Sequence, residues 1–468
     1  MGGPGRLPRS APAAEGVSAA GILAFLDAVE RRRLQLHSLM VLRHGAVIAE
    51  GWWRPYQADL PHQLYSLSKS VTATAVGCAV AEGRLSVDDP VVGFFPGELP
   101  AAVGPNLAAM RIRHLLTMTS GHDQDTTGRI HQQGPSWVRA FLALDVEHAP
   151  GSHFVYNSGA TYMLSAIVQR VTSQPLVEYL APRLFGPLGI LGPTWESCPL
   201  GINVGGWGLS LTTEDIARFG LLYLRGGRWG DRQIVPAEWV AAATAKQVPN
   251  GDGGASDWAQ GYGYQFWRCR HGLYRGDGAH GQFCVVLPAH DAVVAITGGT
   301  DALQAVLDCV WDHVLPAMDG PGAPSGDSAL AERLAGLSVG PVDVLDGPPP
   351  GWADRTYRLE GNAAGLESVG LVWDAGGCTL TLVEGGVTQR IQAGLGHWLA
   401  ATAAAGGAPA PCAGRVAWSE EGELRLDWAF TTTPFVRTLR IRPAGAGHQL
   451  EYRTNVGRHA GGLTIRGT

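Results

Sequence analysis

Apolar residues recur at helical spacing in several segments of the first 318 residues, and these segments predict amphipathic or buried helices. The predicted helices are Val17–Arg33, Ser66–Gly83, Thr212–Gly226 and Ala302–Leu315. The second ends at Gly83, a residue typical of helix C-termini, and the third opens with Thr212-x-x-Asp215, which resembles a capping box.

Other segments of the same region alternate at the period of a strand. Ser38–Glu50 predicts two short strands joined by a turn at His44-Gly45. Gln282–Leu287 and Ala292–Thr297 predict an antiparallel pair. Strands at both ends with helices between them indicate an α+β domain over residues 16–318, whose sheet joins N- and C-terminal strands.

Two Gly/Pro-rich segments separate this domain from the rest of the chain. They are Asp319–Asp327 and Asp346–Gly351, and they delimit a predicted linker, 319–353, that carries one short helix, Ala329–Leu337. Beyond the linker, residues 354–468 alternate in short runs between Gly-rich turns, which predicts a small all-β domain of barrel or sandwich type.

The predicted strands of this second domain include Cys378–Val383, Glu423–Phe430, Thr438–Ile441 and Gln449–Tyr452. The low-complexity segment Ala400–Pro411 predicts a loop instead.

The composition of the chain excludes several classes of partner and cofactor. A net charge of −6 supplies no basic field for a polyanion, so we expect no nucleic-acid partner. No apolar run approaches the ~20 residues of a membrane span, and Met1–Gly16 lacks the apolar core of a signal peptide, so we expect a cytoplasmic protein without a membrane partner. The seven cysteines form no C-x-x-C pair and the histidines show no ligand spacing, which predicts reduced thiols, no metal and no cofactor.

Lysine usage singles out one position. Of the 35 basic residues only Lys69 and Lys246 are lysines. An ammonium group can give up its proton when buried, whereas a guanidinium stays protonated. Lys69 lies three residues after Ser66 at the start of a predicted helix, so the two side chains are within reach of each other as base and nucleophile. The alternative is that Ser66 only caps the helix and Lys69 is solvated.

Two further motif matches are rejected because the predicted elements around them do not fit the motif. Gly276-x-Gly278-x-x-Gly281 has the spacing of a dinucleotide fingerprint, but a strand follows it where that fingerprint requires a helix. Gly336–Gly340 matches G-x-S-x-G, but it follows a predicted helix inside the linker rather than a strand. We therefore do not expect Ser338 to be a nucleophile.

Five blocks in order resemble the serine β-lactamase and penicillin-binding-protein-like superfamily. They are Ser66-x-x-Lys69, Ala81–Pro96, Ile112–Gly121, Tyr156-Asn157-Ser158 and Trp207–Gly227. Gly261–Trp267 and His280-Gly281-Gln282 are most similar to the class C-like hydrolases of the 6-aminohexanoate-dimer hydrolase and esterase branch. The resemblance implies an antiparallel sheet flanked by helices, an all-helical lobe and, as in some relatives, a lipocalin-like C-terminal domain.

The resemblance also implies roles for residues of the second motif. Tyr156 is expected to shuttle the proton, with Ser158 in the third position of a Tyr-x-Ser motif and Asn157 displaced by one. This departure from Tyr-x-Asn argues against penicillin-like amide recognition.

The third motif of the superfamily corresponds to Gly278–Gln282, which contains no lysine. A backbone N–H near Gly281 and Gln282 is expected to complete an oxyanion hole with that of Ser66. His280 either occupies the second position of the motif or points into the pocket, and Trp207 is a candidate pocket wall.

These observations predict a metal-independent serine hydrolase that cleaves an ester, an amide or a short peptide through an acyl-Ser66 intermediate, with Lys69 and Tyr156 moving the proton. One alternative is an acyltransferase or peptide cyclase, in which an amine or alcohol releases the acyl group. Another is a catalytically silent binding protein on the same scaffold.

Overall fold

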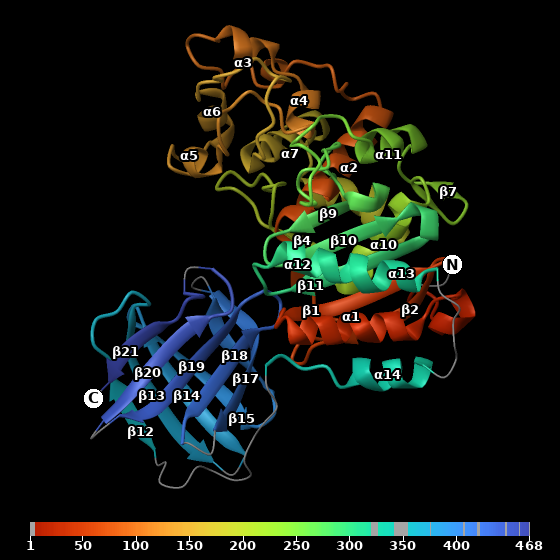
Figure 1. Cartoon of the computed structure of the whole chain (residues 1–468). Coiled ribbons are helices and arrows are strands. Elements are labelled where there is room, and N and C mark those ends of the chain that lie inside the picture. The colour runs from red at the N-terminus through yellow and green to blue at the C-terminus, as the bar shows by residue number, and fades with distance from the viewer. Residues whose placement is uncertain are drawn as a thin grey trace.

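Two β-sheets of different construction organise the chain in the computed structural model (Figure 1). The structure describes residues 5–319, 326–340, 354–374, 376–405, 408–418, 422–444, 447–457 and 459–467. The first sheet uses residues between 36 and 298, and the second uses residues from 355 onward. Within these described ranges, no helix combines the length and the hydropathy needed to cross a membrane.

The first sheet has six antiparallel strands in the order β2-β1-β11-β10-β9-β8. They are β1 (Leu36–Arg43), β2 (Ala46–Trp52), β8 (Trp267–Arg268), β9 (Tyr274–Gly278), β10 (Gln282–Leu287) and β11 (Ala292–Gly298). Because β1 pairs with β11, Met40 opposite Ala295, the sheet joins the two ends of this domain. The predicted α+β architecture is confirmed.

Helices cover both faces of this sheet (Figure 1). The helices involved are α1 (Ala19–Arg31), α12 (Leu303–Cys309) and α13 (Leu315–Ala317) on one face, and α10 (Thr213–Leu224) and α2 (Ser68–Ala81) on the other. Successive β1 side chains point to opposite faces, so Leu39 and Val41 join the α1 core while Met40 and Leu42 join the α10 core. Burial on both faces explains why the central strands β10 and β11 are apolar along most of their length.

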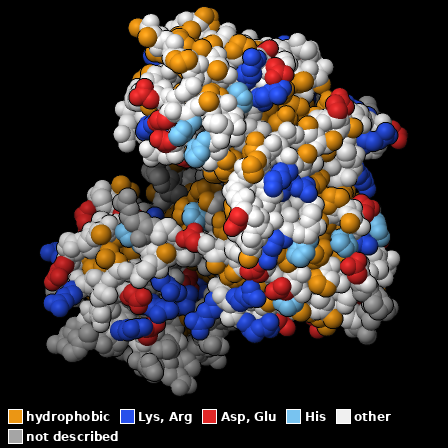
Figure 2. Space-filling model, turned by 45° about the horizontal axis from the view of Figure 1, so that its top comes forward, with side chains coloured by type: hydrophobic (Ala, Val, Ile, Leu, Met, Phe, Trp, Pro, Cys, Tyr) orange, Lys and Arg blue, Asp and Glu red, His pale blue; other side chains and the backbone are white. Residues whose placement is uncertain are grey.

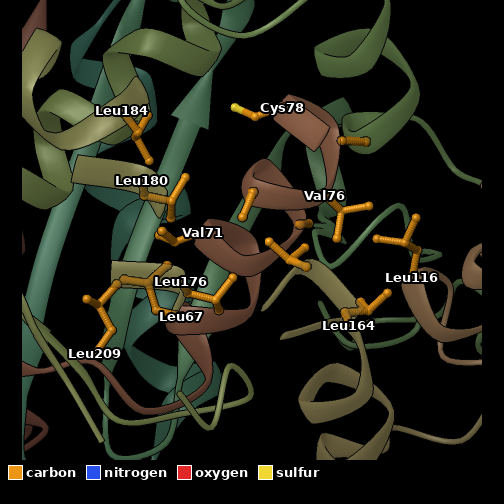
Figure 3. Packing of buried hydrophobic residues seen from close by; sticks show 14 of the residues in the cluster. Leu67, Val71, Val76, Cys78, Leu116, Leu164, Leu176, Leu180, Leu184 and Leu209 are labelled. Atoms are coloured by element: carbon orange, nitrogen blue, oxygen red, sulfur yellow. The ribbon is translucent and has the colours of Figure 1, made fainter. Parts of the chain in front are cut away.

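Helix α2 is surrounded by apolar side chains (Figure 3). Val71 lies toward Leu180 on one side and Val76 toward Leu116 on the other, all within one hydrophobic cluster. The predicted helix over 66–83 is thus present, but its first residues form a separate 3₁₀ turn, Tyr65–Leu67. A helix packed on every side holds its N-terminal turn in a fixed place.

An all-helical lobe lies beyond α2 (Figure 1). It contains α3 (Pro105–Ala109), α4 (Ile112–Leu116), α5 (Thr127–His131), α6 (Trp137–Leu142), α7 (Ser158–Thr172), α8 (Leu176–Leu180), α9 (Gly186–Leu188) and α11 (Ala237–Thr244). Short strands complete the domain: β3 (His62–Gln63), β4 (Thr194–Trp195) and β5 (Leu209–Leu211) form one small sheet, and β6 (Arg228–Trp229) pairs with β7 (Arg232–Gln233).

The C-terminal domain is a single curled β-sheet around its own apolar core. Its strands are β12 (Arg355–Arg358), β13 (Leu366–Asp374), β14 (Gly377–Glu384), β15 (Val387–Leu395), β16 (Leu399–Ala405), β17 (Ala408–Trp418), β18 (Leu424–Phe430), β19 (Val436–Ala444), β20 (Gly447–Thr454) and β21 (Leu463–Gly467). The curl brings the ends of the sheet together, because the Glu360 N–H donates to the Arg466 carbonyl at 3.2 Å. This confirms the predicted all-β domain.

The loop prediction for Ala400–Pro411 was wrong. Most of this segment forms β16 and the start of β17, which pair antiparallel with Ala401 opposite Cys412. Small alanine side chains give no β-pattern in the sequence, but Ala403 and Cys412 are buried in the C-terminal core and the ladder satisfies the backbone. Tertiary pairing therefore decides the structure here.

The C-terminal sheet contacts the first domain directly. The Gln63 N–H donates to the Thr432 carbonyl at 2.9 Å, and the Asn455 amide donates to the Gly299 carbonyl at 2.8 Å. Helix α14 (Asp327–Ala335), within the predicted linker, packs Leu334 against β2. Residues 320–325 and 341–353 of that linker lie outside the described residues.

Candidate active site

Ser66 lies in the tight turn that precedes α2. Its neighbour Tyr65 has φ 50°, a left-handed conformation that costs energy for a residue with a side chain. The Ser68 hydroxyl donates to the Tyr65 carbonyl at 2.6 Å and accepts from the Leu209 N–H at 3.2 Å, which ties the turn to β5. The surrounding structure therefore holds Ser66 in place, with its side chain partly exposed.

Lys69 is the central group of the site. Its Nζ lies 2.9 Å from Ser66 Oγ, 3.0 Å from Ser158 Oγ and 2.7 Å from the Gly206 carbonyl oxygen. The residue is only 1% exposed, and burial lowers its pKa to about 7, with the charges of Asp125 and Asp277 acting in the opposite direction. The neutral amine is therefore well populated near pH 7, and its lone pair can accept the Ser66 proton.

Tyr156 stands beside the same pair. The Lys69 Nζ lies 4.8 Å from the centroid of the Tyr156 ring, and the ring stacks on Trp267 at 5.2 Å. Burial, followed by the charge of Asp277, raises the pKa of Tyr156, while its hydrogen bond with Ser66 acts the other way. The phenol therefore keeps its proton near neutral pH and serves as a donor.

Ser158 begins α7 and reaches the site from the helical lobe. Its hydroxyl accepts from Lys69, and its backbone N–H donates to Asp125 Oδ1 at 3.1 Å. Asp125 was not predicted from the sequence. The only local signal is Asp125-Thr126-Thr127, an Asx-type turn in which the same carboxylate also accepts from the Thr127 N–H and hydroxyl.

Asn157 points away from the nucleophile, contrary to its predicted role in substrate binding. Its side-chain oxygen accepts from the Thr126 N–H at 3.1 Å, the Thr126 hydroxyl at 2.8 Å and the Ala160 N–H at 3.3 Å. The residue is fully buried and caps α7. Its contacts give it a structural role.

Strand β9 runs beside the nucleophile turn and approaches it closely. A Cβ on Gly276 would lie 2.4 Å from Leu67 Cδ1, and a Cβ on Gly278 would lie 2.1 Å from the Leu64 carbonyl oxygen. At Gly278 only glycine allows this approach, because the contacted atom belongs to the backbone. The arrangement places the strand edge and the turn that follows it next to Ser66.

The turn after β9 carries the third predicted motif. His280 adopts φ 66°, its Nδ1 lies 2.7 Å from Asp301 Oδ1, and its ring meets Tyr65 edge-on at 5.1 Å. It also lies 5.8 Å from Phe435 of the C-terminal domain. His280 thus stands at the side of the nucleophile turn where the two domains meet, and Gly281 with φ 95° lets the chain turn into β10.

Gln282 does not face the site, which differs from its predicted contact with substrate. Its side-chain N–H groups donate to the Ala279 carbonyl at 3.1 Å and the Gly298 carbonyl at 2.9 Å, and its oxygen accepts from the Gly298 N–H. The side chain is fully buried. These bonds fasten the turn, which leaves only the backbone of Gln282 for substrate.

The sequence analysis did not predict the buried ion pair between Arg275 and Asp277, which lies near Tyr156. The Arg275 Nε donates to Asp277 Oδ2 at 2.9 Å, and the guanidinium lies 4.4 Å from the Trp258 ring. Arg275 is 0% exposed, so its charge acts through little water on Tyr156, and the charge of Asp277 acts on both Tyr156 and Lys69. The signal in the sequence was the i, i+2 spacing, which puts both residues on one face of a strand.

Trp207 adjoins Gly206, whose carbonyl binds Lys69. Its ring lies 5.6 Å from that of His131 and 6.2 Å from that of Trp137, and it is partly exposed. These three rings form an aromatic group at the helical-lobe side of the lysine.

The fold and this geometry agree with the comparisons with known proteins. A family model described as Beta-lactamase matches residues 25–302. The chain belongs to this family of serine hydrolases, as the resemblance of its motifs predicted.

Named relatives include hydrolases. The 6-aminohexanoate-dimer hydrolase of Paenarthrobacter ureafaciens is 28% identical over 278 residues, which cover 55% of this chain and 71% of the relative. Esterase EstB of Burkholderia gladioli is 32% identical over 208 residues, or 38% of this chain and only 53% of the esterase.

A solved structure covers both domains. It is the octameric penicillin-binding protein homologue from Pyrococcus abyssi, with a TM-score of 0.52, 17% identity and coverage of 96% of this chain and 99% of that chain. At this identity the likeness supports the fold of the whole chain.

Proposed function

We propose that the protein is a serine hydrolase that cleaves an ester or amide bond through an acyl-Ser66 intermediate. The observation that carries the proposal is the buried Lys69 amine, which lies 2.9 Å from the hydroxyl of the partly exposed residue Ser66 and whose pKa is lowered to about 7 by burial. A lysine in that state can take a proton from a nucleophile at neutral pH.

In the acylation step, the Ser66 oxygen attacks the substrate carbonyl while its proton passes to the Lys69 amine. The oxyanion accepts hydrogen bonds from the Ser66 N–H and from a backbone N–H of the 278–282 turn. As the tetrahedral intermediate collapses, the bond to the leaving group breaks. The proton held by Lys69 passes through the Tyr156 hydroxyl to that leaving group.

Deacylation reverses these roles. Water attacks the acyl carbonyl, its proton passes to the same lysine, and the bond to Ser66 breaks as the serine regains a proton. Tyr156 fits the relay because the raised pKa keeps it a phenol that can donate and accept at once.

A fluorophosphonate probe tests the nucleophile. Wild-type protein should gain the mass of one phosphonyl adduct, and Ser66→Ala should gain none. The matched control is Ser338→Ala, because Ser338 is the serine of the G-x-S-x-G match and lies outside the site. Labelling that survives in Ser66→Ala would contradict the assignment, and a wild type that never labels would indicate the silent binding protein.

One observation favours acyl transfer as a second candidate. The Phe435 ring of the C-terminal domain lies 5.8 Å from the His280 ring, so that domain covers one side of the nucleophile turn. A site that limits water favours an amine or alcohol acceptor.

Product analysis separates the two reactions. A p-nitrophenyl ester is incubated with and without amine acceptors, and the products are identified by mass. Hydrolysis predicts only the free acid, whereas a predominant amide product would favour the transferase or cyclase.

A further inference from the structure

A polar cavity of about 710 Å³ lies at the junction of the two domains, and none of Ser66, Lys69 and Tyr156 lines it. Its walls come from the end of α1, the segment after α14 and strands β18, β19 and β20. Its basic lining residues are Arg33, Arg333, Arg425, Arg440 and Arg453. Among its described lining residues Glu30 alone is acidic, in a chain whose net charge is −6.

The arginines of the sheet crowd one another. Arg425 on β18 lies directly opposite Arg440 on β19, and Arg453 follows on β20 opposite Thr438. Like charges opposite each other across a ladder are unfavourable. In the view of Figure 2, basic side chains gather where the C-terminal sheet meets the first domain.

Nearby carboxylates offset only part of this charge: Glu30 forms an ion pair with Arg333, and Asp427 forms one with Arg425. Asp427 is 3% exposed and is already shared, because it accepts from Arg415 at 3.0 Å, Arg425 at 2.9 Å and Thr438 at 2.7 Å. Its oxygens are therefore committed to the wall of the cavity.

Arg440 and Arg453 are paired less closely than Arg333 and Arg425. The nearest carboxylate oxygens to Arg440 are 3.6 Å away on Glu423 and 4.0 Å away on Glu451, and the buried Arg440 Nε makes no hydrogen bond among the described residues. Arg453 has no carboxylate within 4.0 Å in the described part of the chain, and burial together with Arg440 and Arg425 lowers its pKa. An anion bound between Arg440 and Arg453 would balance the positive charge of both.

We infer that this cavity binds a small ligand with a densely charged diphosphate-type group, held by Arg440 and Arg453 and bordered by Arg425. Forked guanidinium groups suit phosphoryl oxygens, which they bind in pairs of hydrogen bonds. A volume of 710 Å³ falls within the range usual for small-molecule sites. Because both domains line the cavity, the bound ligand would also bridge them. The inference does not depend on the proposed hydrolase activity.

Titration calorimetry and thermal unfolding with inorganic pyrophosphate, at constant ionic strength, test the inference. Wild-type protein should bind one equivalent in a saturable manner and unfold at a higher temperature. Arg440→Gln and Arg453→Gln should each bind at least tenfold more weakly. The matched control Arg390→Gln changes an exposed arginine of β15 that does not line the cavity, and it should bind like wild type.

Two further variants and one further ligand sharpen the test. Ser66→Ala should bind pyrophosphate normally, which separates the cavity from the active site. Without ligand, Arg453→Gln should unfold no earlier than wild type, because it loses repulsion rather than an ion pair; a marked fall would make Arg453 a structural residue. Equal responses in all variants, no saturation, or tighter binding of citrate than of pyrophosphate would each overturn the inference.

Discussion

At the residue scale, Lys69 differs from the arginines that supply almost all other positive charge of the chain. Its amine is buried against three oxygens and its pKa is lowered to about 7. Arginine could make the same hydrogen bonds, but it could not release a proton at this pH. The site therefore depends on the ability of one side chain to change its charge.

Replacing that side chain tests this dependence. Lys69→Arg should lower kcat/KM for an ester substrate by about 10²–10⁴-fold, because the general base is lost while the positive charge stays. The control is Lys246→Arg, which changes the exposed second lysine and should leave activity unchanged. In the wild type, kcat/KM should rise with pH around 7, since the base acts in its deprotonated form. A flat profile from pH 6 to 8 would contradict the account.

Tyr156 has a separable role. Tyr156→Phe keeps the stack on Trp267 but removes the hydroxyl, so kcat should fall by about 10²-fold or more while unfolding is little changed. Steady-state kinetics and thermal unfolding measure the two effects. Wild-type turnover in this variant would exclude the phenol from the proton path.

The sequence predicts the reactive residues of this site better than it predicts the hydrogen bonds and charges that hold them in place. Ser66, Lys69, Tyr156 and Ser158 do lie together. The side-chain amides of Asn157 and Gln282 are already hydrogen-bonded to other parts of the chain, and such bonds are visible only in three dimensions. The same holds for Asp277, because long-range folding places its charge beside Tyr156.

At the element scale, β9 owes its position to glycine. A Cβ on Gly278 would lie 2.1 Å from the Leu64 carbonyl oxygen, a backbone atom that cannot rotate away. Gly278→Ala should therefore move β9 from the nucleophile turn, lower the free energy of unfolding by about 1–3 kcal/mol and reduce activity.

Chemical denaturation and ester hydrolysis measure these effects. Gly97→Ala is the control, because a Cβ there meets nothing within 4 Å. If Gly278→Ala behaved like Gly97→Ala, the close approach of strand and turn would be absent in solution.

Helices and strands are predicted correctly where the segment itself contains a cap or a hydrophobic period. The helix at 213–224 begins with the reciprocal Thr212–Asp215 bonds that its capping box predicted. The segment 400–411 has no such signal, because alanine and glycine favour no face of a sheet. Its two strands form by pairing with each other and with β18, and hydrophobic periodicity does not reveal such pairing.

At the scale of the whole molecule, a buried histidine pair lies at the junction of the domains. His37 Nδ1 lies 3.0 Å from His62 Nε2, His37 stacks on Tyr56 at 3.7 Å, and the Tyr56 hydroxyl donates to the Thr433 carbonyl of the C-terminal domain. Burial lowers the pKa of both histidines, that of His62 to about 4. The folded state therefore holds them neutral.

This arrangement predicts sensitivity to acid. Between the unfolded pKa near 6.5 and the folded pKa of His62 near 4, the unfolded chain binds more protons than the folded chain. The free energy of unfolding therefore decreases as the pH is lowered through this range, by up to about 1.4 kcal/mol per pH unit for His62, and the lowered pKa of His37 acts in the same direction. Denaturation curves from pH 7 to 4.5 should show a shallower slope for His62→Gln than for the wild type. His153→Gln, at an exposed position, should keep the wild-type slope, and equal slopes in all three would contradict the prediction.

The central claim is that a neutral lysine lies beside Ser66. It can be measured directly because Lys69 and Lys246 are the only two lysines of the sequence. Protein labelled with ¹³Cε-lysine should give two side-chain NMR signals, and Lys246→Arg assigns them by removing one. The account predicts that the Lys69 signal titrates near pH 7. A Lys69 signal that stays protonated until pH 10 would contradict it.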